Sequence, residues 1–434
     1  MPWFHKQAPA ISRPEIEQMC QRTLDEARSR MKVDFRRVLL LPPDLTRAHS
    51  GAGWITETFY KLLPRTCDIH VIPTLGQHVP HDEATNRWMF GSIPNDRIHA
   101  HDWRNGCANI GTIAASLVKE RTGGLVDWDI PVQVNTMTVK EKWDFIINIG
   151  HVVPHEVLGF ANHNKNYFIG LAGKDMICAA HMAAATYGIE NNLGNLVTPL
   201  RHCFNYAEER FLGHLPDVYF QVTLQRDARN QLVHSGAFVG DDLETYMMAA
   251  RLSARQNIIT FDKGVKKIVA VMQADEFKAT WVANKAIYRT RLAMADGGEL
   301  LIIAPGLERF GEQPDVDALI RKYGYCGTPR VLELYKKNKD MQDLAHGAAH
   351  LMHGSSEGRF KITYAPGKLS RQEMEGVHFG YADLDETLQR YNPDKMEEGW
   401  NTMPDGERIF FISTPSAGLW STRARLAERE AAKV

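Results

Sequence analysis

Short apolar runs alternate with helix-length amphipathic segments from about residue 15 to residue 300, and this alternation restricts the fold more than any other feature. Apolar runs of about four to eight residues are typical of buried strands, and a segment with helical periodicity follows each of them here. A chain that alternates in this way builds parallel sheets flanked by helices. We therefore expect an α/β fold with mainly parallel sheets.

The expected elements fall into two runs of the same rhythm. The first has strands at 37–41, 69–72, 143–149 and 218–222 and helices at 13–31, 54–63, 109–120, 175–187 and 243–254. The second has strands at 267–271 and 300–303 with a helix at 283–295 between them. We expect two domains, over residues 1–262 and 263–420, followed by a charged terminal helix over 421–434.

Composition and charge exclude several classes of function. The 434 residues contain 51 Lys and Arg against 52 Asp and Glu, a net charge of −1, so no general attraction to nucleic acid or to an anionic membrane is expected. No run approaches the ~18 apolar residues of a membrane span, and the first residues lack the pattern of a signal peptide. The 6 cysteines are scattered without a CxxC pair. We expect a cytoplasmic protein with reduced thiols.

The segment from Pro42 to Gly53 joins an expected strand to an expected helix and contains Asp44, Thr46 and Arg47. A strand-to-helix turn offers backbone N–H groups and the positive end of a helix dipole, which suit an anion such as phosphate. An arginine can add a bidentate contact. A capped loop with a surface arginine is the alternative interpretation.

Two further segments place histidines just after expected strands. His78 lies in Thr74–Pro80, and His155 lies in a longer segment that runs on through Lys165 to a helix containing His181. In α/β sheets, loops at the carboxyl ends of strands form the ligand-binding crevice. Histidine is the side chain best suited to proton transfer near neutral pH. Taken singly, each histidine could equally be a loop or core residue that bonds a backbone carbonyl.

The same histidines leave a zinc-dependent hydrolase open as an alternative. His78, His151, His155 and His163 could supply metal ligands, but none has the spacing of an HExxH helix. His346, His350 and His353 lie on one helical face without the glutamate of such a helix. For that run we expect an interface-facing or partly buried helix.

The combined pattern resembles the lactate racemase family. The resemblance rests on Asp44-Leu45-Thr46-Arg47, on Thr74-Leu75-Gly76-Gln77-His78-Val79-Pro80, and on Pro154-His155 followed 10 residues later by Lys165 and 16 residues after that by His181. It implies a two-domain α/β protein with the active site in the cleft between an N-terminal, cofactor-binding domain and a C-terminal domain that closes over the substrate.

The resemblance also implies a role for each of these residues. Lys165 would attach the nickel-pincer nucleotide, a pyridinium bis-thiocarboxylate mononucleotide that carries nickel, and His181 would bind the nickel. His78 and His155 would be the two acid/base histidines. Asp44, Thr46 and Arg47 would anchor the nucleotide. The expected partners are a small 2-hydroxy acid and the enzymes that make the cofactor and insert nickel, with no nucleic acid and no membrane.

Departures from the family pattern bear on the substrate. Asn162 and Asn164 stand in a polar stretch that replaces glycine-rich sequence, and Arg289 and Arg291 stand where a Gln and a Lys are common. The arginines could pair with a substrate carboxylate, and the asparagines would suit extra hydroxyls. We therefore expect a racemase or epimerase that inverts C2 of a 2-hydroxy acid, with a polyhydroxylated sugar acid favoured over lactate. A non-catalytic protein that binds the cofactor or an organic acid is a further alternative.

Overall fold

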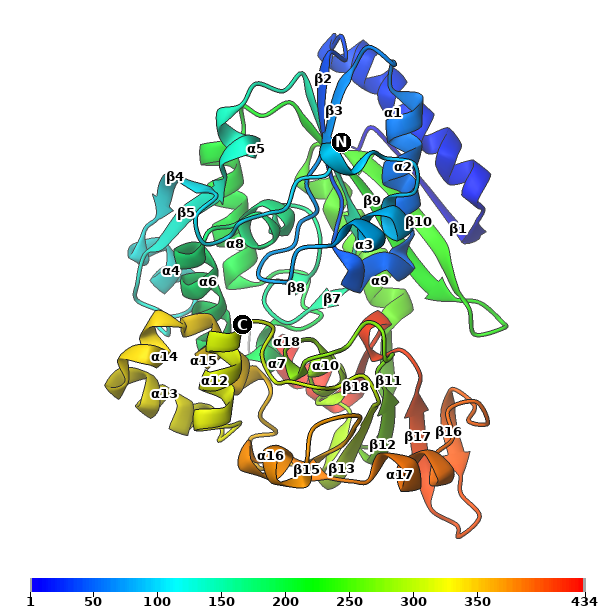
Figure 1. Cartoon of the computed structure of the whole chain (residues 1–434), viewed down its shortest axis with the longest axis vertical. Coiled ribbons are helices and arrows are strands. Elements are labelled where there is room, and N and C mark those ends of the chain that lie inside the picture. The colour runs from blue at the N-terminus through cyan, green and yellow to red at the C-terminus, as the bar shows by residue number, and fades with distance from the viewer. Residues whose placement is uncertain (1, 432–434) are drawn as a thin grey trace. The chain divides into compact units, whose positions relative to one another are not determined.

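The computed structural model describes residues 2–431 and divides the chain into two compact units. Unit 1 comprises residues 1–180 and 195–256, and unit 2 comprises residues 181–194 and 257–434. The predicted α/β class with parallel-rich sheets and flanking helices is confirmed (Figure 1).

Unit 1 is built on a six-stranded sheet with the order β1-β10-β9-β6-β2-β3. β9, β6, β2 and β3 are parallel to one another, whereas β10 pairs antiparallel with β9 and β1 pairs antiparallel with β10. The strands are β1 (Phe4–Ile11), β2 (Arg37–Leu41), β3 (Asp68–Val71), β6 (Phe145–His151), β9 (Asp217–Arg226) and β10 (Leu232–Gly240). The four parallel strands were predicted from the sequence, whereas the antiparallel strands β1 and β10 were not.

The helices of unit 1 follow from their caps and apolar faces. In α1, the Glu15 carboxylate accepts a hydrogen bond from the Ser12 backbone N–H at 2.8 Å, which satisfies a free donor at the helix start. Ile16, Cys20 and Leu24 form a buried stripe on α1. This stripe lies in the same hydrophobic core as Phe145, Ile147 and Ile149 of β6. The helices are α1 (Arg13–Met31), α2 (Ala52–Leu62), α3 (Glu83–Phe90), α4 (Ala115–Arg121), α5 (Thr136–Lys140), α8 (Pro199–Ala207) and α9 (Leu243–Asn257).

Two small hairpins extend unit 1. β4 (Cys107–Ile113) pairs antiparallel with β5 (Ile130–Asn135), and β7 (Pro154–His155) pairs with β8 (Gly159–Phe160). The predicted helix at 109–120 is therefore wrong in its first half, since residues 107–113 form a strand and the helix starts only at Ala115. The pairing with β5 provides partners for the backbone N–H and C=O groups that a helix would otherwise have paired with one another.

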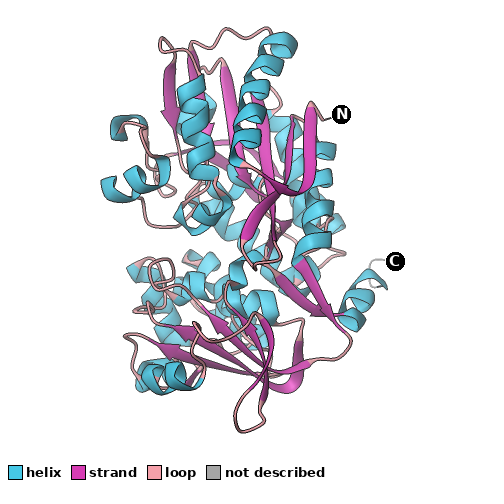
Figure 2. Cartoon of the chain, turned by 90° about the vertical axis from the view of Figure 1, so that its right-hand side faces the viewer, coloured by secondary structure: helices cyan, strands magenta, loops and turns pink. Residues whose placement is uncertain are grey.

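Unit 2 is built on a second six-stranded sheet with the order β15-β14-β13-β12-β17-β16, parallel except where β16 meets β17. Figure 2 shows helices beside the strands of each sheet. The strands are β12 (Val265–Val271), β13 (Met294–Ala304), β14 (Lys361–Pro366), β15 (Gly380–Tyr381), β16 (Gly399–Thr402) and β17 (Arg408–Ile412). A separate parallel pair joins β11 (Ile258–Phe261) to β18 (Leu419–Thr422).

The helices of unit 2 are mostly short. They are α7 (Ile189–Asn192), α10 (Thr280–Ala283), α11 (Lys285–Thr290), α12 (Pro314–Tyr323), α13 (Thr328–Lys337), α14 (Lys339–Asp343), α15 (Ala345–His353), α16 (Arg371–Gly376), α17 (Leu384–Arg390) and α18 (Arg423–Ala431). α6 (Lys174–Tyr187) spans the division between the units at residue 180. The predicted helix at 283–295 ends early, because residues from Met294 onward already belong to β13.

The last residues of the predicted terminal helix, 432–434, lie outside the described part of the chain. Among residues 2–431, no helix has the length and apolar character needed to cross a membrane.

Candidate active site

Three of the predicted segments follow three neighbouring parallel strands of unit 1. Asp44 comes after β2, His78 after β3 and His155 after β6, and the sheet places these strands in the order β6-β2-β3. The carboxyl ends of parallel strands meet at one edge of a sheet, which is where such folds bind their ligands. The fold therefore directs all three segments to the same edge.

Asp44 and His78 are in direct contact. The Nδ1 atom of His78 is hydrogen bonded to Oδ2 of Asp44, and the hydroxyl of Thr46 donates to Oδ1 of Asp44 at 2.9 Å. Asp44 is buried at 4% exposure, whereas His78 is partly exposed. Because an ionised carboxylate can only accept, Nδ1 of a neutral His78 carries the proton, and Nε2 keeps its lone pair. Asp44 thus fixes the tautomer that can act as a base.

His81 supports the same loop and was not singled out from the sequence. Its Nε2 accepts a hydrogen bond from the backbone N–H of Leu45 at 3.0 Å. Burial lowers the pKa of His81 below its usual value, which keeps the ring neutral and able to accept. The signal available in the sequence was its position three residues after His78.

The loop that carries His78 packs against the turn that follows Lys165. The backbone N–H of Thr74 donates to the Pro42 carbonyl at 2.8 Å, and that of Gly76 donates to the Gly170 carbonyl at 2.8 Å. A Cβ atom on Gly170 would lie 2.5 Å from the Cβ of Thr74, so only glycine permits this approach. The structure therefore brings the second and third predicted segments together.

His155 is buried and has the opposite arrangement of its ring nitrogens. Its Nδ1 accepts a hydrogen bond from the backbone N–H of Val157 at 3.2 Å, and its Nε2 lies 3.6 Å from Oε1 of Glu156. An Nδ1 that accepts leaves the proton on Nε2 in the neutral ring. His78 therefore presents a lone pair at Nε2, whereas His155 presents a proton there.

Lys165 stands out from its surroundings by exposure. Among residues 157–173, every side chain is buried except that of Lys165, which is partly exposed. The short π-helical turn Asn166–Gly170 follows it directly. The other two predicted cofactor residues, Arg47 and His181, are also partly exposed. Arg47 lies in the 3-10 turn Leu45–Ser50, and His181 lies about two turns into α6.

The two predicted substrate-binding asparagines point into the protein. Asn164 is fully buried, its amide donates to Asn205 at 2.7 Å and to Glu208 at 2.9 Å, and its oxygen accepts from Arg201. These bonds use both amide N–H donors and one lone pair of the oxygen, all toward α8 and the turn after it, so they give no support to the prediction that Asn164 binds substrate. Asn162 is 2% exposed, and its oxygen accepts from the Asn166 amide at 2.7 Å.

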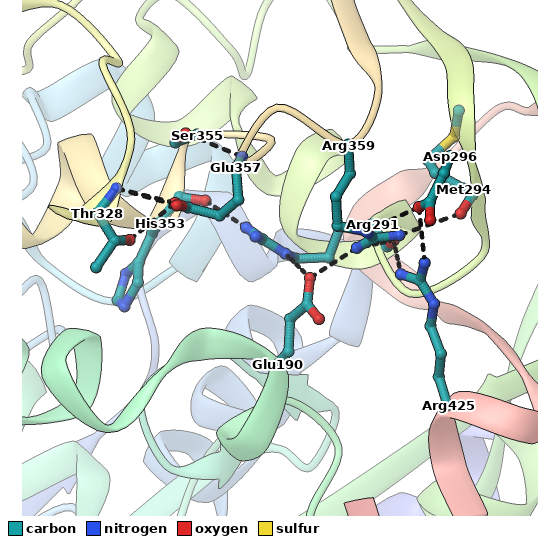
Figure 3. A network of polar contacts seen from close by, with 10 residues as sticks. All are labelled: Glu190, Arg291, Met294, Asp296, Thr328, His353, Ser355, Glu357, Arg359 and Arg425. Carbon is teal, nitrogen blue, oxygen red and sulfur yellow. Dashed lines mark hydrogen bonds and ion pairs between the residues drawn. The ribbon is translucent and has the colours of Figure 1, made fainter. Parts of the chain in front are cut away.

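Arg291 belongs to an internal network of unit 2 (Figure 3). Its Nε donates to Glu190 at 3.0 Å and its Nη1 to the His353 carbonyl at 2.9 Å, and only 1% of the residue is exposed. Glu190 also accepts from Arg359 at 2.9 Å. Glu190 already provides a carboxylate for Arg291, so the predicted pairing of Arg291 with a substrate carboxylate stays a prediction that this network does not support. Arg289 is 2% exposed on α11, and its contact with substrate stays a prediction.

Metal-binding side chains do not gather into a cluster in the described part of the chain, residues 2–431, where no group of three or more His, Cys, Asp or Glu could hold an ion. The His346–His353 run forms a buried helix, α15, as the sequence predicted in part. His350 is bonded there to the hydroxyls of Tyr288 and Tyr325, both at 2.9 Å. The zinc alternative therefore lacks a ligand set among these residues.

Comparison with known proteins places this site in a family. Residues 12–192, which contain Asp44, His78, His155, Lys165 and His181, match the family described as the lactate racemase N-terminal domain. The chain carries a lactate racemase N-terminal domain. The family predicted from the sequence is therefore confirmed over these residues. A search of curated proteins found no match.

Two solved structures share the fold of this lactate racemase-like chain. The crystal structure of a Thermotoga maritima protein is 23% identical, with a TM-score of 0.82, over 96% of this chain and 100% of that one. The lactate racemase apoprotein from Thermoanaerobacterium thermosaccharolyticum is 15% identical, with a TM-score of 0.64, over 94% and 93%. At these identities the likeness shows the fold alone. The family match is what implies racemase or epimerase activity.

Proposed function

We propose that this protein is an isomerase that inverts C2 of a 2-hydroxy acid, with His78 and His155 as its acid and base. The observation that carries the proposal is the opposite hydrogen bonding of the two Nδ1 atoms, since that of His78 faces a carboxylate and that of His155 faces a backbone N–H. A lone pair at Nε2 of His78, fixed by Asp44, and a proton at Nε2 of His155 are what a two-base isomerase needs at the start of one direction of reaction.

The roles of the two histidines follow from the stereochemistry. The enantiomers of a 2-hydroxy acid place their hydroxyl groups on different sides of C2, so one base is needed on each side. His78 would accept the hydroxyl proton of one enantiomer, and His155 would return a proton to the oxygen of the other. In the reverse direction the two exchange roles, because an acid that has given its proton is a base.

The residues present fit the nickel-pincer nucleotide. Lys165 offers a primary amine at the one partly exposed side chain of a buried segment, and His181 offers a partly exposed imidazole on a helix rich in alanine. Thr46 and Arg47 stand where a strand meets a turn, a place suited to a phosphate group, and the neighbouring carboxylate of Asp44 is bonded to His78. When bound, the cofactor supplies a hydride acceptor and donor next to the substrate. Since the cofactor carries most of its own metal donors, one imidazole from the protein is enough.

The substrate class is a 2-hydroxy acid. The preference for a polyhydroxylated sugar acid now rests on the departures in sequence alone, because Asn162, Asn164 and Arg291 all bond within the protein. A cytoplasmic location, with enzymes of cofactor synthesis and nickel insertion as partners, belongs to the same proposal.

The deciding experiment is peptide mass spectrometry with nickel analysis on protein co-expressed with cofactor-synthesis enzymes. We expect a nucleotide-sized adduct on the peptide containing Lys165 and about one nickel per chain. Lys165→Arg should carry no adduct, whereas Lys174→Arg, which changes a nearby partly exposed lysine, should carry as much as the wild type.

Unmodified Lys165 with stoichiometric zinc, beside a working positive control, would overturn the proposal in favour of the hydrolase. An adduct without inversion of any chiral 2-hydroxy acid would favour a binding protein.

A further inference from the structure

The loop of residues 160–164, which we call the lysine loop because Lys165 follows it, has an uncommon backbone. Asn162 and His163 adopt φ angles of 68° and 58°, in the left-handed region. Glycine enters this region freely, whereas a residue with a Cβ atom is strained there, histidine more than asparagine. Two such residues in succession persist only where the surrounding structure holds them.

Arg201 holds the lysine loop in place through hydrogen bonds from its guanidinium. Its Nη2 donates to the Phe160 carbonyl at 2.6 Å, and its Nη1 donates to the Asn162 carbonyl at 3.4 Å and to the side-chain oxygen of Asn164. The guanidinium therefore bonds to alternate residues of the loop. Arg201 is 2% exposed and lies over the ring of Tyr246 at 4.5 Å. Only a planar fork of donors can reach all three acceptors at once.

Glu208 holds the other end of the lysine loop. One of its oxygens accepts from the Asn164 amide at 2.9 Å and lies 3.7 Å from Nδ1 of His163. The other oxygen accepts from the hydroxyl of Tyr219. The His163 ring is stacked on Tyr219 with centroids 4.3 Å apart, so the strained residue is fixed by its side chain as well.

These supports come from one helical face. Arg201, Asn205 and Glu208 are spaced i, i+4 and i+7 along α8 and the turn that continues it, so their side chains lie above one another. Asn205 completes the set by accepting from the Asn164 amide at 2.7 Å. This polar stripe at i, i+4 and i+7 was the signal in the sequence that could have revealed these supports.

We propose that Arg201 is a positioning residue for Lys165. It fixes the lysine loop on the N-terminal side of Lys165, while the backbone bonds Asn166 N–H to His163 O and Phe168 N–H to Asn164 O, both 2.9 Å, fix the turn after it. Lys165 is then the side chain left at the surface of a segment whose other members are buried. Pre-organising a reactive amine in this way lowers the cost of placing it against its partner. The inference rests on the proposed function only in taking Lys165 as the attachment point.

The test uses the reactivity of Lys165 in the full-length protein without cofactor. An N-hydroxysuccinimide acetate is applied to wild type, Arg201→Met and Arg201→Lys, and acetylation of each lysine is followed by peptide mass spectrometry. With the lysine loop released, we expect Lys165 to react about threefold faster or more in both variants, with Lys174 unchanged. Arg201→Lys keeps the charge but loses the fork, so it should resemble Arg201→Met. Arg251→Met, which removes an exposed ion pair with Glu244, is the matched control.

A second readout is the fraction of Lys165 that carries the cofactor adduct after co-expression. We expect this fraction to fall in the Arg201 variants and to remain at the wild-type value in Arg251→Met. If Arg201→Met does not fold, Asn164→Ala removes one of the three Arg201 contacts from the loop side, together with the bonds to Asn205 and Glu208, and should also increase acetylation of Lys165. Unchanged acetylation of Lys165 in folded variants would overturn the inference. An absent adduct in the wild type would instead overturn the proposed function, because the acetylation test needs no cofactor.

Discussion

The Nδ1 atom of His78 is hydrogen bonded to the carboxylate of Asp44, which in turn accepts from the hydroxyl of Thr46 at 2.9 Å. This relationship gives Asp44 a role that the sequence did not suggest. The family resemblance assigned it to the cofactor, whereas the structure joins it to the histidine proposed as a base. One buried carboxylate can orient the imidazole and stabilise the cation that forms when Nε2 takes up a proton.

Asp44→Asn therefore tests the link between the two residues. Asparagine keeps the shape of the side chain but can offer its amide N–H to Nδ1, which would favour the wrong tautomer of His78. We expect the rate of inversion to fall about 100-fold, the lower range for loss of general acid/base catalysis. Chiral chromatography of a panel of 2-hydroxy acids measures the rate, and the Lys165 adduct measures cofactor loading. A full rate with normal loading would contradict the role of Asp44.

Replacing His78 and replacing His155 should each abolish the oxidation of a different enantiomer. His78→Ala removes the base for one enantiomer and His155→Ala the base for the other, so each variant should oxidise only one enantiomer in a single turnover. The 2-keto acid released on acid quench, trapped with dinitrophenylhydrazine, measures each half-reaction. His214→Ala, an exposed histidine of the same unit, is the control. Loss of both half-reactions in both variants would argue for one shared acid/base group.

The contacts of this site could be predicted from the sequence only where the strand order brings the residues together, and not where they depend on partners far along the chain. The meeting of Asp44 with His78 was within reach, because both follow parallel strands and such strands end at one edge. The contacts of Asn164 were not, because its partners Asn205 and Glu208 lie 41 and 44 residues further along the chain. A polar triplet beside a reactive lysine therefore looked like a substrate site, although its side chains face inward.

The same limit explains the errors in secondary structure. The helix predicted over 109–120 extended into residues that pair as a strand, with Ile113 opposite Ile130 and Asn109 opposite Gln133. β1 was missed for a similar reason, since its partner β10 lies more than 200 residues away in the sequence. Tertiary pairing overrides local preference in short strands.

Asp217 predicts a dependence of stability on pH. Desolvation raises the pKa of Asp217 to about 7, with the nearby Glu208 carboxylate adding to the shift, and the hydroxyl of Tyr167 donates to it at 2.7 Å. Between about pH 4 and pH 7 the folded state holds a proton that the unfolded chain has lost, so stability falls as pH rises through this window. Asp217→Asn removes the effect.

We expect Asp217→Asn to stabilise unit 1 by about 2 kcal/mol at pH 8, where solvent that reaches this partly exposed residue screens part of the effect. The gain should be much smaller at pH 5, because the folded state then still holds the proton on Asp217. Chemical denaturation at both values of pH measures the difference. Asp34→Asn, which changes a carboxylate whose side chain is 80% exposed, should show no such trend. A gain in stability that is larger at pH 5 than at pH 8 would show that the sign is wrong.

Replacing Arg291 should lower the stability of the protein and leave its affinity for substrate unchanged. Arg291 donates to Glu190 and to the His353 carbonyl, and its own carbonyl accepts from Arg359 at 3.5 Å and from Arg425 at 3.3 Å (Figure 3). Replacing it by methionine keeps the backbone acceptor but leaves the His353 carbonyl and Glu190 without this donor. We expect Arg291→Met to lower the free energy of unfolding by about 2–3 kcal/mol, as the loss of a buried, hydrogen-bonded charge does when its partner can still reach water.

Arg330→Met, which removes an exposed pair with Glu333, is the control and should change the free energy of unfolding by less than about 0.5 kcal/mol. Urea denaturation gives both values, and the KM for a 2-hydroxy acid should stay at that of the wild type in both. A raised KM in Arg291→Met with unchanged stability would restore the substrate role that the sequence suggested.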